Sequence, residues 1–70
     1  MKYVGIKQVL KAVKDGEATK VYVGNDAEEH VTAELIKICN ENKIEIVKIE
    51  TMAELGKLAG IDIGASAAAE

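Results

Sequence analysis

The stretch that decides the fold class runs from Lys20 to Ile49, KVYVGNDAEEHVTAELIKICNENKIEIVKI. It begins and ends with β-branched, mostly alternating apolar residues, which predict one strand at residues 20–23 and another at residues 44–49. The residues between them have helical spacing up to about Asn42. Because a helix joins the two strands, we expect the strands to be parallel and the crossover to be right-handed. The stretch therefore predicts an α/β fold in which helices cover a small sheet.

The helix inside this stretch has one apolar face, formed by Val31, Leu35, Ile38 and Cys39. Asn25 or Asp26 is its expected N-cap, and carboxylates in the first turn favour the positive end of the helix dipole. We therefore interpret the acidic residues Asp26, Glu28 and Glu29 as capping residues.

Two more helices are predicted, one on each side of this unit. Each has its apolar residues on one face: Ile6, Val9, Leu10 and Val13 in the first helix, and Met52, Leu55 and Leu58 in the last. Gly16 and Gly60 are placed to end these helices, and Thr51 with Glu54 has the spacing of a capping box at the start of the last one. The chain after Gly60 is expected to be a loop up to Gly64, followed by a tail of small residues.

Composition limits what a chain of this length can do. The 70 residues are 49% hydrophobic and 30% charged and include no proline, which indicates one small folded domain. A single cysteine, Cys39, cannot form an intramolecular disulfide, and with one histidine, His30, it cannot complete a zinc site of the usual type. We expect Cys39 to be buried, His30 to be solvated, and no cofactor or metal to be bound. Without a membrane-spanning or signal segment, a cytoplasmic location is expected.

Positive charge is concentrated at the N-terminal end of an acidic chain. The net charge is −3, yet five lysines against Asp15 and Glu17 give residues 1–20 a charge of +3. The chain contains no arginine, so no bidentate guanidinium is available for phosphates or guanine edges. Two tyrosines are the only aromatic residues, which argues against a platform that stacks several bases.

The first predicted helix carries a lysine stripe opposite its apolar face. Lys7, Lys11 and Lys14 lie at i, i+4 and i+7, and we expect no acidic partner beside them. Gly5 at the helix start allows the unpaired amides there to approach an anion, and Gln8 can read a base edge with its amide. The stripe is interpreted either as a phosphate-binding face or as an ordinary solvated helix face.

The C-terminal part offers a second candidate surface. Ile61 and Ile63 lie in a loop between two glycines and form either a plug into the core or an apolar clamp for a ligand, of which the plug is favoured. Lys57, in the last turn of the third helix, is interpreted as a partner for the exposed carbonyls at the helix end. Ser66 has no base partner, and we find no constellation of catalytic residues.

Two of these segments resemble a known family. Gly5–Lys11, GIKQVLK, is similar to the start of the first helix in the kink-turn RNA-binding large-subunit ribosomal protein family of the seven-Ae and thirty-e type, with the Lys-Gln pair of its bacterial branch. Glu54–Ala69, ELGKLAGIDIGASAAA, is similar to the family's Leu-Gly-Lys helix, apolar recognition loop and alanine-rich run. The resemblance covers nearly the whole chain in the same order.

The resemblance implies a three-layer α-β-α sandwich around a small mixed sheet, formed by a single domain over residues 1–70. It also implies binding of the kink-turn, a sharply bent RNA motif with tandem sheared G·A pairs, in a ribosomal or ribosome-associated role. By this resemblance, the contacts to the G·A pairs and adjoining phosphates would come from Gly5, Lys7, Gln8 and Lys11. The loop under an extruded nucleotide would consist of Ile61, Asp62 and Ile63, with Lys57 near the RNA backbone.

The alanine run of this family usually continues into a strand that completes the sheet. Because the sequence stops at Glu70, we expect that strand to be missing or trimmed, and an exposed sheet edge could then support self-association. Two other functions stay open. One is a protein–protein adaptor that keeps the fold without RNA affinity, favoured by the net acidity and the absence of arginine. The other is an accessory domain of a larger RNA-modifying enzyme.

Overall fold

The strand–helix–strand unit has the arrangement that its sequence predicts. In the computed structural model, which describes residues 1–70, β2 (Lys20–Gly24) and β3 (Glu45–Ile49) pair in parallel. α2 (Glu29–Glu41) connects them, so the prediction of parallel strands joined by a helix is confirmed.

Two short strands extend the sheet beyond this unit. β4 (Ala67–Ala69) lies between β2 and β1 (Tyr3–Val4) and is antiparallel to both, which gives the strand order β1-β4-β2-β3 and a mixed sheet. The prediction of a small-residue tail outside the regular elements is therefore wrong for these three alanines, which are fully buried. Small side chains suit a central strand that helices approach on both faces. β1, with two residues, is too short to give a period-2 pattern, and the sequence did not predict it.

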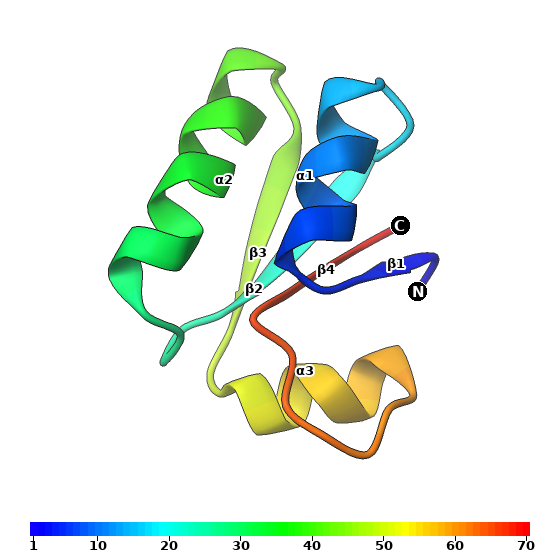
Figure 1. Ribbon diagram of the computed structural model, residues 1–70, viewed down its shortest axis with the longest axis vertical. Coiled ribbons are helices and arrows are strands. Elements are labelled where there is room, and N and C mark those ends of the chain that lie inside the picture. The colour runs from blue at the N-terminus through cyan, green and yellow to red at the C-terminus, as the bar shows by residue number, and fades with distance from the viewer.

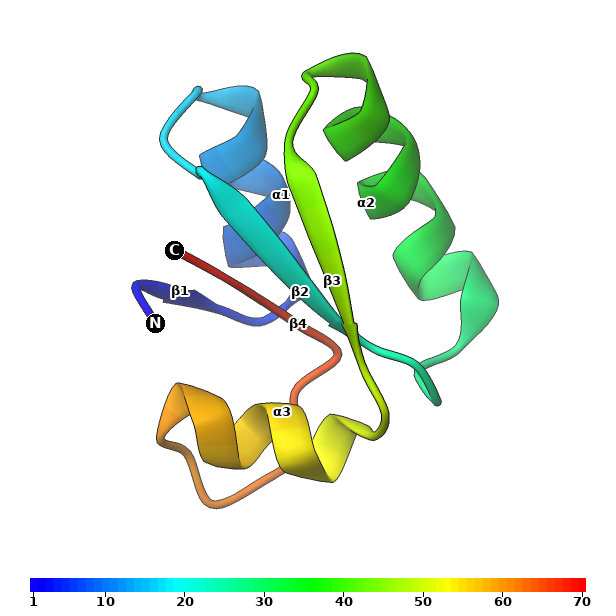
Figure 2. The ribbon, with the colours of Figure 1, turned by 180° about the vertical axis from the view of Figure 1, so that it is seen from behind.

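Three helices cover the sheet (Figures 1 and 2). α1 (Ile6–Lys14) and α2 lie side by side against one face, where Val21, Val23 and Leu35 belong to the larger core. α3 (Met52–Ala59) packs through Leu55 on the other face, against Ala68 and a smaller core. The α/β class with helices on both faces of a mixed sheet is confirmed. None of the three helices combines the length and the apolar character that a membrane crossing requires.

Glycine ends two of the helices as predicted. Gly16 and Gly60 have φ angles of +73° and +81°, and the amides that follow them donate to the carbonyls of Ala12 and Gly56, respectively. α2 ends with the same pattern of hydrogen bonds, but Lys43 occupies the left-handed position with φ +57°. A side chain in that conformation is strained, so this cap is less favourable than the other two.

The start of α2 differs from the prediction. The N-cap is Glu28, whose side chain makes no capping bond, and neither Asn25 nor Asp26 caps this helix. Asp26 instead accepts a hydrogen bond of 2.7 Å from the backbone N–H of Met52, the first residue of α3. Thr51 caps α3 as predicted, since its Oγ1 accepts from the Glu54 N–H at 3.1 Å. The first turn of α3 is therefore held by two side chains from different parts of the chain.

Candidate functional site

The first turn of α1 has backbone amides that no side chain caps. Gly5 precedes the helix with φ +101° and ψ +148°, a conformation that essentially only glycine adopts, and its N–H donates to the carbonyl of Ala67 at 2.9 Å. The amides of the first turn have no intrahelical partner, and no side chain caps them. The exposed side chains of Lys7 and Gln8 extend from the same turn. This end of α1 is therefore a positively polarised surface flanked by one cation and one amide.

The lysine stripe follows the whole length of α1. Lys7, Lys11 and Lys14 are all exposed, as both interpretations of the stripe require. The expectation that they have no acidic partner is wrong, because Lys11 Nζ lies 3.5 Å from a carboxylate oxygen of Asp15, one turn further on. An exposed pair of this kind holds its partners only weakly. Lys14 is at the opposite end of the helix, about 12 Å along the axis from its start. Lys7 is thus the lysine of the stripe that lies beside the free amides.

The two isoleucines of the loop after α3 have different environments. Ile61 is half-buried and packs against the smaller core, and its N–H donates to the carbonyl of Gly56 at 3.0 Å. Ile63 is 75% exposed, the highest exposure of any large apolar residue in the chain. The core plug is therefore right for Ile61 and wrong for Ile63. Asp62 and Lys57 are also exposed.

Gly56 holds this loop against α3. A Cβ at this position would overlap the carbonyl oxygen of Ile63 and lie 3.0 Å from its carbonyl carbon and 3.2 Å from the Cα of Gly64. The loop backbone thus lies directly on the helix, which directs the side chain of Ile63 outward. A glycine inside a short helix was the one signal in the sequence of this close approach.

The backbone connects these two surfaces. Ile63 is four residues before Ala67, so their Cα atoms are at most about 14 Å apart, and the carbonyl of Ala67 is bonded to the N–H of Gly5. In Figure 1 the first turn of α1 faces the side of the molecule where α3 and its loop lie. The structure therefore brings the predicted residues Gly5, Lys7 and Gln8 to the same end as the loop, and leaves Lys14 away from it.

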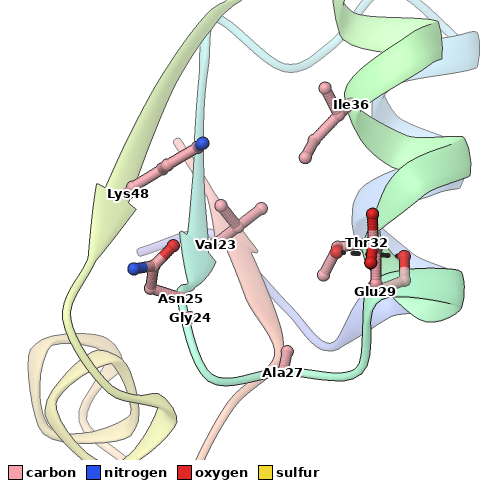
Figure 3. Close-up of a pocket in the computed structure, with 8 residues that line it drawn as sticks. All are labelled: Val23, Gly24, Asn25, Ala27, Glu29, Thr32, Ile36 and Lys48. Carbon is pink, nitrogen blue, oxygen red and sulfur yellow. Dashed lines mark hydrogen bonds between the residues drawn. The ribbon is translucent and has the colours of Figure 1, made fainter.

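A separate hollow lies between β3 and α2 (Figure 3). It has a volume of about 450 Å³, and its lining includes Asn25, Glu29, Thr32 and Lys48. Lys48 stands on the face of the edge strand that α2 covers, where an apolar side chain would fill the space. The Thr32 hydroxyl lies 3.5 Å from the carbonyl oxygen of Glu28 and 3.4 Å from that of Glu29, and its single proton is donated to these carbonyls at the start of α2. None of the residues predicted to bind RNA lines this hollow.

The remaining chemically reactive side chains are accounted for by the fold. Cys39 is fully buried in the larger core, and burial raises the pKa of its thiol, so the reactive thiolate is disfavoured. The side chain of His30 is 79% exposed, with Nε2 3.2 Å from a carboxylate oxygen of Glu28. The predictions of a buried cysteine and a solvated histidine are confirmed.

Comparison with known proteins gives one consistent result. The sequence model of the family described as "Ribosomal protein L7Ae/L30e/S12e/Gadd45 family" matches residues 3–70. The RNA-binding protein TTE2299 of Caldanaerobacter subterraneus subsp. tengcongensis is 51% identical over 67 residues, which cover 96% of this chain and 82% of the relative. The RNA-binding protein YbxF of Geobacillus stearothermophilus is 38% identical over 66 residues, 94% of this chain and 80% of the relative.

A solved structure agrees with the fold. The Giardia lamblia 15.5kD RNA binding protein superposes with a TM-score of 0.87 over 94% of this chain and 56% of that chain. The two sequences are 24% identical, so this similarity supports the arrangement of helices and strands alone.

Proposed function

This chain belongs to the family described as "Ribosomal protein L7Ae/L30e/S12e/Gadd45 family", and on that premise we propose that it recognises kink-turn RNA through two surfaces. It is an RNA-binding protein of a non-enzymatic family. The first proposed surface is the first turn of α1, with Gly5, Lys7 and Gln8. The second is the loop Ile61–Ile63. The observation that carries the proposal is that the N–H of Gly5 bonds to the segment leading out of this loop, so both surfaces border one end of the molecule.

The first turn of α1 has the groups needed to bind a distorted RNA groove. Its free amides and the ammonium of Lys7 attract phosphate oxygens, and the Gln8 amide can both donate to and accept from base edges. Lys11 and Lys14 continue the positive stripe along the helix and would meet phosphates further from the G·A pairs. This local charge supports RNA binding although the whole chain has a net charge of −3.

The loop after α3 supplies the contact to an unstacked base. Bases in RNA are read most readily where they are splayed out of the helix, and an exposed apolar side chain can pack against such a base. Ile63 is available for that contact, because its side chain is directed into solvent by a backbone that lies on Gly56. Asp62 and Lys57 are also exposed, and the proposal assigns Lys57 a contact to the RNA backbone.

We include in the proposal a single RNA-binding domain over residues 1–70 and a cytoplasmic, ribosome-associated role.

The salt dependence of RNA affinity tests the proposed contacts between lysines and phosphates. If the three lysines of the stripe and Lys57 all meet phosphates, log K should fall with log salt at a slope of about −2.8 to −3.6. Lys7→Ala should make the slope shallower by about 0.7–0.9 at unchanged Tm. The matched control is Lys37→Ala, since Lys37 is an exposed lysine on α2 outside both surfaces. A flat salt response would contradict the proposal.

A protein–protein adaptor is the second candidate function. The net acidity and the absence of arginine favour it, because both weaken attraction to a polyanion. This alternative predicts that kink-turn RNA binds no better than an unrelated duplex and that Lys7→Ala has no effect on any affinity measured.

A further inference from the structure

Asp26 lies far in sequence from the loop that presents Ile63, yet a short series of contacts joins the two. Its carboxylate accepts the Met52 N–H at 2.7 Å. The carbonyl of the same residue, Met52, accepts the N–H of Ala65 at 3.0 Å. Ala65 directly follows the loop. The backbone of Met52 is therefore hydrogen-bonded through its N–H to the turn after β2 and through its carbonyl to the end of the loop.

The side chain of Met52 reinforces this connection. The hydroxyl of Ser66 donates to its sulfur at 3.7 Å. A Cβ on Gly24 would lie 2.7 Å from its Cγ, and one on Gly64 would lie 3.3 Å from its Cβ, so both glycines allow close packing on Met52. Met52 is thus enclosed by the end of β2 and by the segment that follows the loop.

Asp26 itself sits in a turn that is fixed on both sides. The Asn25 N–H donates to the carbonyl of Ile49 at 2.7 Å, which ties the turn to the end of β3. The Ala27 N–H donates to the carbonyl of Gly24 at 3.0 Å, which closes the turn. These two bonds hold the backbone of the turn, and from it the exposed side chain of Asp26 reaches the first amide of α3.

We infer that Asp26 is a positioning residue for RNA recognition: through Met52 and Ala65 it sets the place and orientation of the loop that exposes Ile63. This inference rests on the proposed function for its effect on RNA, whereas the connection itself is a property of the free protein. The sequence suggested a different role, N-cap of α2, which the structure excludes.

The test compares Asp26→Ala, Asp26→Asn and a matched control, Thr51→Ala. Asn keeps the Oδ1 acceptor, whereas Ala removes it. Thr51→Ala removes the other capping bond of the same helix turn, to the Glu54 N–H, and leaves the Met52 N–H bonded. All three are titrated with a kink-turn RNA. Amide hydrogen exchange of residues 60–65 is measured by NMR in the free protein.

We expect Asp26→Ala to weaken RNA binding about tenfold and to accelerate exchange at Ala65 and its neighbours. Asp26→Asn should behave nearly as wild type. Thr51→Ala should lower Tm with little change in either readout. Equal effects of Asp26→Ala and Thr51→Ala on loop exchange would overturn the inference, because general fraying of α3 would then explain both. If the wild-type protein shows no preference for the kink-turn, the proposed function fails, and loop exchange in the free protein still decides the role of Asp26.

Discussion

For the substitution Gly56→Ala, helix propensity and the packing of the loop predict opposite changes in the stability of the protein. Alanine inside a helix is about 1 kcal/mol more favourable than glycine, so propensity alone predicts a stabilised protein. In this structure the new Cβ would overlap the carbonyl oxygen of Ile63, a backbone atom that cannot rotate away. Overpacking of this kind costs about 1–3 kcal/mol. The net expectation is destabilisation by about 1 kcal/mol, which lowers Tm by roughly 4–8 °C in a domain of this size.

Thermal unfolding followed by circular dichroism measures the sign, and Gly60→Ala is the matched control. Gly60 has φ +81°, and a Cβ added there would meet no atom within 4 Å, so alanine costs about 1 kcal/mol through the left-handed backbone alone. Both variants should lose similar stability, but only Gly56→Ala should shift the amide resonances of Ile63 and Gly64 and weaken RNA binding. A rise in Tm for Gly56→Ala would show that the loop backbone does not lie against Gly56.

Three further predictions concern single side chains. Ile63→Asp should lower affinity for kink-turn RNA about tenfold, roughly 1.4 kcal/mol, at unchanged Tm. Ile61→Asp should instead lower Tm, because it places a charge against the smaller core. A fall in Tm for Ile63→Asp would show that Ile63 is part of the core. Lys43→Gly should stabilise the protein by about 0.5–1 kcal/mol, measured by urea unfolding, and a loss of stability would contradict the strain assigned to the cap of α2. Because burial raises the pKa of Cys39, its thiol should react with a labelling reagent at pH 8 far more slowly in the folded than in the urea-unfolded protein; equal rates would show that the thiol is accessible.

Signals carried by neighbouring residues predicted much of the fold. Gly16 and Gly60 end helices, and Thr51 caps one, because each depends only on residues a few positions away. The parallel pairing of β2 and β3 followed from the helix between them. These features are local or follow from chain connectivity, so sequence patterns were sufficient.

Contacts between distant segments could not be predicted in this way. The alanines of β4 form a strand because they lie between β1 and β2, a position that their own weak strand propensity does not indicate. Asp26 is a residue type typical of N-caps. In the fold, however, α3 packs beside its turn, and the carboxylate accepts the N–H of Met52, which is 26 residues away in sequence. Leu58 was expected on the inner face of α3, yet it is 58% exposed, because that helix covers the sheet mainly through Leu55.

The candidate site was predicted in its residues more than in its geometry. The sequence pattern indicated Lys7, Gln8 and the loop isoleucines as candidates. It could not distinguish Ile61 from Ile63, because the direction of a side chain in a loop depends on the conformation of the loop backbone. The pair of Lys11 with Asp15 was readable from the i, i+4 spacing and was missed.

The most direct test of the account is a calorimetric titration of the protein with a kink-turn RNA and with the same RNA in which Watson–Crick pairs replace the tandem G·A pairs. Recognition through the first turn of α1 and the Ile63 loop predicts a preference for the intact motif of more than about 2 kcal/mol, roughly thirtyfold. Equal, weak binding of the two RNAs would contradict the account and leave nonspecific attraction between lysines and phosphates as the explanation.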